Sequence, residues 1–123
     1  MIKLSQRSTI SPATLDSGFS PNFSNDRSNL WAVGFGITAN DNNPYPLRLQ
    51  EVEVKYVTNS KCRETQGPLI KEEMICAGEG GEGACKGDSG GPLWDAETNI
   101  VVGVTSWSNT CEFPNVPGEY IFQ

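Results

Sequence analysis

The chain has 123 residues, of which 37% are hydrophobic and 20% are charged, and its formal net charge is -6. These values are typical of a single globular domain and exclude an intrinsically disordered chain. Because no apolar run approaches membrane-spanning length and charges of both signs are scattered, we expect neither a membrane nor a nucleic-acid partner.

The N-terminal third predicts a connector followed by strands. Residues 5–30 are rich in Ser, Asn, Pro and Thr, so they predict a surface loop with at most one short strand. The apolar and aromatic run 30–37 predicts a strand that its glycines allow to bend. Apolar and polar residues then alternate over 47–56 with one change of phase, which predicts a strand interrupted by a bulge.

The remaining elements are short. The capping side chains of Thr58, Asn59 and Ser60 predict a helical turn over 60–64 that ends before Gly67. Many short strands and no long helix predict an all-β barrel or sandwich. The further predicted strands, each a short apolar run between turn-rich segments, are 74–77, 92–94, 100–106 and 120–122.

Cysteine and histidine content limits the chemistry. The sequence contains no histidine and no CxxC pair, so we expect no zinc site, no other metal and no cofactor. Because histidine is the usual general base near neutral pH, no imidazole takes part in the chemistry of this chain by itself. An even number of cysteines favours two disulfides, and the alternative is four free thiols in a cytosolic protein. The cysteines are Cys62, Cys76, Cys85 and Cys111.

The N-terminus does not match the expected compartment. A disulfide framework implies an oxidising, extracellular environment. Residues 1–8 are partly basic but contain no apolar segment of the length that a signal peptide needs. Either the thiols stay reduced, therefore, or Met1 is not the true start of the protein.

Residues 83–93, with the sequence GACKGDSGGPL, carry the candidate chemistry. Glycine allows unusual dihedral angles and removes side-chain cover, so the N–H groups of Gly87 and Ser89 can converge on one point. The Ser89 hydroxyl would then lie beside a position where a carbonyl oxygen develops negative charge, as acyl transfer requires. Asp88 needs a cationic partner if it is buried. For Gly-Asp-Ser-Gly alone, an ordinary turn between two strands is the alternative.

The longer segment 85–93, CKGDSGGPL, resembles the nucleophile signature of the trypsin and chymotrypsin family of serine peptidases. Nearly the whole chain shares this resemblance. The other segments that resemble the family are Ile2-Lys3-Leu4, Gly34-Phe35-Gly36 with one aromatic residue exchanged, Met74-Ile75-Cys76-Ala77-Gly78, Gly103-Val104-Thr105-Ser106-Trp107 and Pro117-Gly118-Glu119-Tyr120.

The resemblance implies an architecture. It implies an all-β fold: the C-terminal six-stranded antiparallel β-barrel of the trypsin-like fold, with a partial N-terminal segment and a truncated C-terminal helix. Residues 1–123 would be a partial peptidase domain, mainly the second barrel, and residues 5–30 the connector between barrels.

The resemblance also implies roles for individual residues. Ser89 would be the nucleophile, Gly87 and Ser89 would donate the oxyanion N–H groups, and Asp88 would receive the new N-terminal ammonium after zymogen cleavage. Gly83 would lie at the base of the specificity pocket with Ser108 and Gly118 on its walls. The residues assigned to substrate binding are Gly83, Ala84, Lys86, Ser106, Trp107, Ser108 and Gly118.

The resemblance pairs Cys62 with Cys76 and Cys85 with Cys111. A further family disulfide would need cysteines near Leu30 and Asp95, and both are absent together. An uncharged pocket base cannot offset the desolvation of a buried cation, so we expect an apolar or small residue before the scissile bond. Glu82, next to Gly83, is the residue that could overturn this expectation.

The catalytic histidine and aspartate of the family would belong to a segment before Ile2. The first hypothesis is therefore a serine endopeptidase represented by its C-terminal half, inactive alone, with a polypeptide substrate and the missing N-terminal barrel as partners. The alternative is a non-catalytic secreted homologue that binds proteins. The presence of Ser89, Gly87 and Asp88 favours the enzyme, and the coding sequence upstream of Met1 would discriminate the two.

Overall fold

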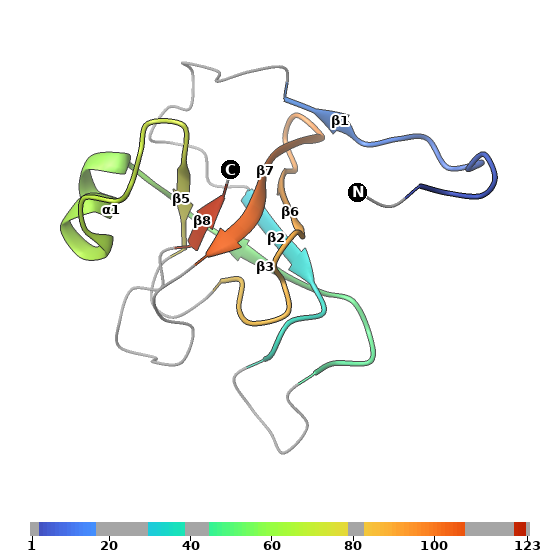
Figure 1. Ribbon diagram of the computed structural model, residues 1–123, viewed down its shortest axis with the longest axis horizontal. Helices are drawn as coiled ribbons and strands as arrows, with labels where there is room; N and C mark the ends of the chain where they lie inside the picture. Colours follow the sequence, from blue (N-terminus) through green and yellow to red (C-terminus); the bar gives the residue numbers. More distant parts are fainter. Residues whose placement is uncertain (1–2, 17–29, 39–44, 79–82, 108–119, 123) are drawn as a thin grey trace.

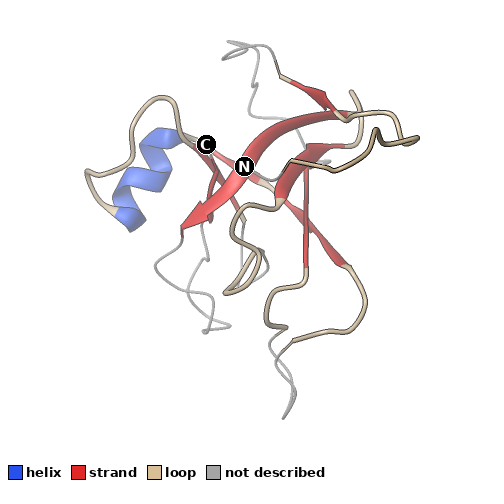
Figure 2. Cartoon of the chain, turned by 45° about the vertical axis from the view of Figure 1, so that its right-hand side comes forward, coloured by secondary structure: helices blue, strands red, loops and turns tan. Residues whose placement is uncertain are grey.

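The computed structural model describes residues 3–16, 30–38, 45–78, 83–107 and 120–122. These residues form a mostly β structure with one short helix at one side of the sheet (Figures 1 and 2). The elements in chain order are β1 (Thr14–Leu15), β2 (Leu30–Gly34), β3 (Gln50–Val54), β4 (Tyr56–Val57), α1 (Asn59–Gln66), β5 (Ile75–Ala77), β6 (Pro92–Asp95), β7 (Ile100–Trp107) and β8 (Tyr120–Phe122).

The strands belong to one sheet with the order β3-β2-β6-β7-β8-β5-β4, and β1 pairs with β7 off this path. Neighbours along the path are antiparallel, whereas β1 and β7 are parallel. The first and last strands of the path, β3 and β4, are separated in the chain by Lys55 alone. The two ends of the sheet therefore belong to one continuous stretch of chain.

The predicted strands are present, with errors of extent: the strand predicted over 30–37 ends at Gly34, and the strand predicted over 47–56 begins later and is divided. Alternation predicted a strand from residue 47, but β3 begins at Gln50, and Leu47 and Leu49 are 94% and 58% exposed. Alternating apolar and polar residues stabilise a strand only where the apolar face packs against other residues, and these two leucines pack against none that would bury them. The alternation changes phase between Leu49 and Val52, where β3 begins, whereas the break between β3 and β4 lies at Lys55.

The helix is longer than the predicted turn over 60–64, because it extends from Asn59 to Gln66. Thr58 caps its N-terminus, and the Thr58 hydroxyl accepts a hydrogen bond of 3.3 Å from the Lys61 N–H. Gly67 ends the helix with a φ of 87°, and its N–H donates to the carbonyl oxygen of Arg63 at 3.0 Å.

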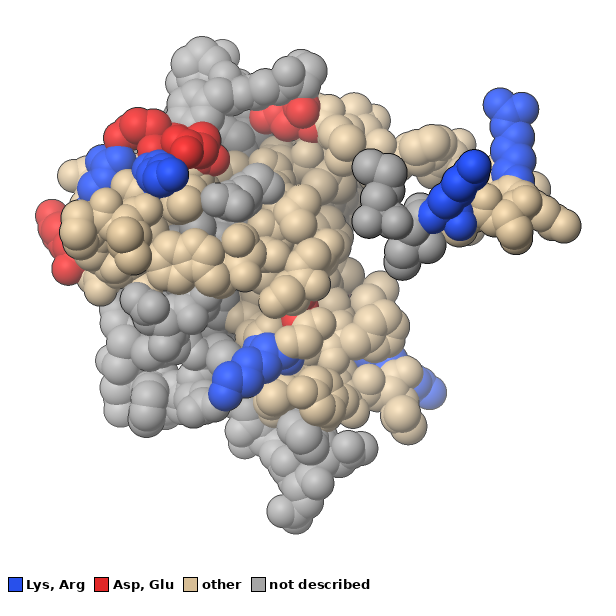
Figure 3. Space-filling view, in the orientation of Figure 1, with Lys and Arg blue, Asp and Glu red and all other residues tan. Residues whose placement is uncertain are grey.

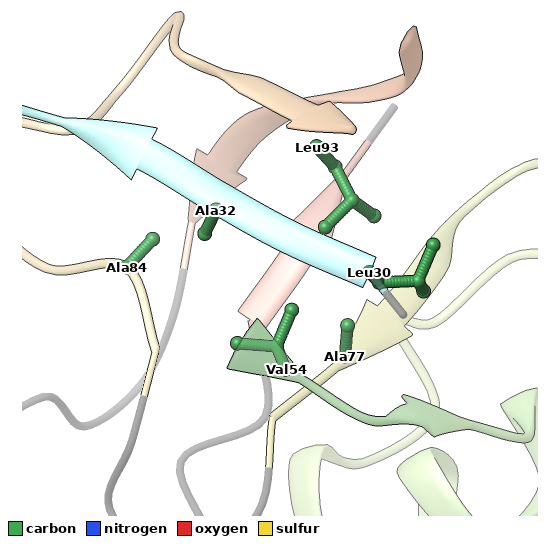
Figure 4. Close-up of a cluster of buried hydrophobic side chains, with 6 residues drawn as sticks. All are labelled: Leu30, Ala32, Val54, Ala77, Ala84 and Leu93. Carbon is green, nitrogen blue, oxygen red and sulfur yellow. The ribbon is translucent and has the colours of Figure 1, made fainter. Parts of the chain in front are cut away.

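Two hydrophobic clusters stabilise the described part of the chain. The first, which we call the turn-side cluster, brings together side chains from β2, β3, β5, β6 and the loop before β6 (Figure 4). Fully burying one leucine contributes about 1.5–3 kcal/mol, so Leu30 and Leu93, both 0% exposed, are its largest contributors. Its members are Leu30, Ala32, Val54, Ala77, Ala84 and Leu93.

The second, the helix-side cluster, packs α1 against β4, β5 and the loop between α1 and β5. The disulfide between Cys62 and Cys76 lies inside it, and Trp107 packs against it from β7. Arg63 adds polar contacts at its edge: its Nε donates to the Ile70 carbonyl oxygen at 2.9 Å, and its guanidinium pairs with Glu72. The members are Val57, Cys62, Ile70, Met74 and Cys76.

The hairpin between β6 and β7 turns on a buried aspartate. The Asp95 side chain is 2% exposed, and its Oδ1 accepts a hydrogen bond of 3.0 Å from the Glu97 N–H. The Asp95 carbonyl oxygen accepts a further bond of 2.8 Å from Asn99, which has a φ of 58°. On the neighbouring strand, Leu30 is the residue that pairs with Asp95 across β2 and β6.

On the face shown in Figure 3, basic and acidic side chains are interspersed, and neither sign covers a broad area. Among the described residues, no helix is long and apolar enough to cross a membrane. The expectations that nucleic acid and membrane are not partners remain predictions.

Candidate active site

The candidate nucleophile lies in a double turn that leads into β6. The Asp88 N–H donates to the Cys85 carbonyl oxygen at 3.0 Å, and the Gly91 N–H donates to the Asp88 carbonyl oxygen at 2.8 Å. Gly87 and Gly90 adopt φ values of 101° and 85°, which glycine adopts without the steric cost that other residues meet. The glycine spacing of the sequence thus produces this turn locally.

The turn is fixed on two sides by backbone hydrogen bonds. At its end, the Gly90 N–H donates to the Thr105 carbonyl oxygen at 2.9 Å, and the Thr105 N–H donates to Gly91 at 2.8 Å. At its start, the Ile37 N–H donates to the Lys86 carbonyl oxygen at 2.9 Å. β7 and the segment after β2 therefore hold the turn between them.

Ser89 is exposed within this turn. In the described part of the chain, the N–H groups of Gly87 and Ser89 donate to no acceptor, so both are available for hydrogen bonding to a ligand. Free N–H donors beside an exposed hydroxyl are the arrangement that can stabilise negative charge on an oxygen attached to a carbon under attack. The geometry is compatible with acyl transfer from Ser89.

Asp88 is half-buried, and its carboxylate points back beneath the turn. Its Oδ1 accepts a hydrogen bond of 2.7 Å from the Gly36 N–H, and its Oδ2 accepts one of 2.8 Å from the Cys85 N–H. Among the described residues, this carboxylate accepts hydrogen bonds from two backbone donors, and the cationic partner expected for a buried Asp88 stays a prediction. The predicted role as receiver of an N-terminal ammonium stays a prediction.

The predicted substrate-binding residues are only partly within the described chain. Gly83 is half-buried with a φ of 154°, and Ala84 is 3% exposed and packs in the turn-side cluster. Lys86 is exposed in the turn itself, and on β7 Ser106 is exposed whereas Trp107 is half-buried. Ser108 and Gly118, the predicted pocket walls, and Glu82 lie outside the described residues.

One predicted disulfide is confirmed. Cys62 and Cys76 are bonded, with their Cα atoms 6.4 Å apart. Cys85 is also disulfide-bonded, but Cys111, the partner that the sequence resemblance assigns to it, lies outside the described residues.

Sequence reasoning missed the contribution of the segment after β2. Gly34, Gly36 and Ile37 contact the turn through Asp88 and Lys86, but the Gly36–Asp88 hydrogen bond joins residues 52 positions apart. No local pattern reports a contact of that separation. The segment Gly34-Phe35-Gly36 contributed to the family resemblance, but that resemblance did not indicate which residues the two glycines contact.

Comparison with known proteins gives the family. The family model described as Trypsin matches residues 1–122. Trypsin delta of Drosophila erecta is 38% identical over 120 residues, which cover 95% of this chain and 45% of the relative. Hypodermin-B of Hypoderma lineatum is 37% identical over 124 residues, which cover 98% of this chain and 47% of the relative.

A solved structure agrees with these relatives. Neuropsin, a serine protease expressed in the limbic system of mouse brain, matches with a TM-score of 0.69 at 32% identity, covering 92% of this chain and 49% of its own. The chain thus spans about half the length of the relatives that it matches. Since the family model extends over almost the full sequence, the chain belongs to the trypsin family of serine proteases.

Proposed function

We propose that this chain is the nucleophile-bearing half of a serine endopeptidase that cleaves polypeptides through an acyl-enzyme. The observation that carries the proposal is the pair of N–H groups, from Gly87 and Ser89, that donate to no acceptor among the described residues and lie beside the exposed Ser89 hydroxyl. Ser89 attacks the scissile carbonyl carbon, and the two N–H groups donate hydrogen bonds to the oxygen that becomes negative. Gly87 and Ser89 are thus the proposed oxyanion hole.

The chain alone is inactive in this proposal. A serine hydroxyl is a weak nucleophile until a base removes its proton, and the sequence contains no histidine. The relatives are about twice as long as the matched region, which leaves room for a segment that supplies the histidine and the aspartate.

The same missing segment is the proposed partner of the extended N-terminal arm. Residues 3–13 extend away from the sheet before β1 pairs with β7 (Figure 1). Leu4 and Ile10 in the arm are 65% and 80% exposed, and Leu15 in β1 is 69% exposed, so apolar surface of the arm and of β1 is left uncovered. An N-terminal barrel of the same protein packed on the arm would bury that surface.

We also propose that the sheet closes as a six-stranded antiparallel barrel. The two ends of the strand order, β3 and β4, continue into each other through Lys55, so counting them as one strand gives a closed ring. Residues 1–123 then form a partial peptidase domain in which 5–30 connect this barrel to the preceding one.

For specificity and location, two smaller proposals follow from single features. Gly83 at the pocket base carries no charge, so a small or apolar residue is preferred before the scissile bond. The Cys62–Cys76 disulfide favours a secreted protein, because reducing compartments do not maintain structural disulfides.

The test uses the protein encoded by the complete reading frame, after the transcript upstream of the Met1 codon has been sequenced. Hydrolysis of peptide reporters is compared for the unmutated protein, Ser89→Ala and Ser60→Ala, an exposed serine on α1. We expect Ser89→Ala to lower turnover roughly a million-fold and Ser60→Ala to leave it unchanged.

Three results would count against these proposals. Equal turnover of the unmutated protein and Ser89→Ala would exclude Ser89 as the nucleophile. A genuine start codon at Met1, with no histidine encoded upstream, would favour the second candidate function, a non-catalytic protein-binding module. The observation that supports this second candidate is the absence of histidine from the chain. Faster cleavage after arginine than after leucine or phenylalanine would overturn the proposed pocket preference.

A further inference from the structure

The Asp88 carboxylate packs against two glycines, Gly34 and Gly36, which are separated by one residue. Gly34 ends β2, and Gly36 lies just beyond it, with Phe35 between them 52% exposed. A Cβ built at Gly34 and one built at Gly36 would both meet atoms of Asp88, so both positions face the turn.

Both glycines are needed for space rather than for backbone conformation. Neither has a φ in the left-handed region. The three atoms nearest to a Cβ built at Gly34 all belong to Asp88, and the same is true at Gly36. In each case the Cβ would overlap a carboxylate oxygen, so any other residue at 34 or 36 displaces Asp88.

The displacement would reach the reactive turn. Asp88 links Gly36 to Cys85 through its two carboxylate oxygens, and its own backbone hydrogen bonds define the double turn. The backbones of Gly36 and Gly87 also approach each other closely, because a Cβ at Gly87 would lie 3.0 Å from the Gly36 Cα. The orientation of the Gly87 and Ser89 N–H groups therefore depends on the carboxylate staying in place.

We propose that Gly34 and Gly36 are positioning residues: they form a side-chain-free cradle for the Asp88 carboxylate and thereby orient the Gly87 and Ser89 N–H groups. The cradle itself is independent of any reaction, and its link to catalysis rests on the proposed function above.

The first test needs no enzyme activity and uses the 123-residue chain. Gly34→Ala is combined with Asp88→Ala and, separately, with Asp88→Asn, whose side chain keeps the shape of aspartate. We expect Gly34→Ala to lower the urea midpoint of unfolding in the unmutated and Asp88→Asn backgrounds, and to lower it much less in the Asp88→Ala background, where the two closest atoms, Asp88 Oδ1 and Cγ, are gone. If Gly34→Ala alone does not fold, recovery of folding by Asp88→Ala supports the cradle equally.

The second measurement reports the positions of the two N–H groups. In amide NMR spectra, Gly34→Ala should shift the Gly87 and Ser89 resonances, and it should not shift them further once Asp88 is alanine. Gly67→Ala is the matched control, because Gly67 has no neighbour within 4 Å of an added Cβ but has a φ of 87°. It should destabilise the chain without moving these resonances.

In the protein from the complete reading frame, we expect Gly34→Ala to lower kcat at least about 100-fold with KM within about 3-fold, as for the loss of an oxyanion donor. Equal costs of Gly34→Ala with aspartate and with alanine at position 88 would overturn the cradle. Unchanged Gly87 and Ser89 resonances would overturn the positioning role. Absence of Ser89-dependent hydrolysis in the unmutated protein would instead refute the proposed function, and the folding and NMR results would still decide the proposal.

Discussion

The turn-side and helix-side clusters are stabilised by different means. The turn-side cluster, around Leu30 and Leu93, is held by apolar packing between strands that are distant in sequence. The helix-side cluster is held by a covalent bond between Cys62 and Cys76 and by a capped helix of eight residues. The reactive turn is attached to the first of these, since Ala84 precedes it and Leu93 follows it.

This difference between the clusters predicts which substitutions the protein tolerates. A disulfide stabilises the fold by restricting the conformations of the unfolded chain, and this contribution persists when nearby side chains pack slightly less well. A packed cluster, in contrast, loses stability with each methylene group that is removed. The turn that carries Ser89 packs against the cluster whose buried members include no cysteine, and the cross-link at the turn itself is made by Cys85. Substitutions near Leu93 should therefore disturb the candidate site more than substitutions of similar size near α1.

The largest expected effect is from Leu93→Ala, which empties the centre of the turn-side cluster. We expect the free energy of unfolding to fall by about 2–5 kcal/mol, measured by urea denaturation. Val104→Ala on β7, where the side chain is 43% exposed, is the matched control and should change it by no more than about 0.5 kcal/mol. Similar losses for both variants would show that packing does not distinguish this cluster from the surface.

Removing the disulfide with Cys62→Ala/Cys76→Ala comes next. The bond closes a loop with a sequence separation of 14, for which the expected loss is about 3 kcal/mol. Substitution is preferable to chemical reduction because Cys85 is also disulfide-bonded. Hydrogen exchange should show a larger loss of protection in α1 than in β2, and an equal loss in both would mean that the two clusters are not separately stabilised.

The smallest effect concerns pH. Burial, and then the negative charge of Glu72, raise the pKa of Tyr56 above its usual value of 10.0. The folded chain thus keeps a proton that the unfolded chain loses, so this contribution to stability is complete below about pH 10 and is lost as the pH rises through the raised pKa.

The pH dependence is checked by urea denaturation at several pH values up to about 11. Tyr56→Phe should show a weaker decline of stability above pH 10 than the unmutated chain, because phenylalanine does not titrate. Tyr45→Phe, at a tyrosine that is 53% exposed, provides the control and should retain the decline. Identical dependence of stability on pH in all three proteins would show that deprotonation of Tyr56 does not cause the decline.

Local sequence signals predicted the elements whose causes are local. The run 100–106 predicted β7, and the glycines at 87 and 90 predicted a turn. The capping side chains at 58–60 and Gly67 predicted a helical turn, but α1 extends beyond the predicted 60–64 at both ends. The leucines at 47 and 49 misled because strand pairing depends on a partner that alternation alone does not reveal. The cradle beneath Asp88 was not predictable, since it joins β2 to a turn 52 residues away.

The pairing of Leu30 with Asp95 limits how this fold can be redesigned. The two positions are opposite each other on adjacent strands and both are buried, so a pair of cysteines there is an obvious way to link the turn-side cluster covalently. Asp95 also binds the Glu97 N–H inside the hairpin, and a cysteine sulfur is a poor acceptor for that bond. Added rigidity between β2 and β6 would thus come with a looser β6–β7 hairpin.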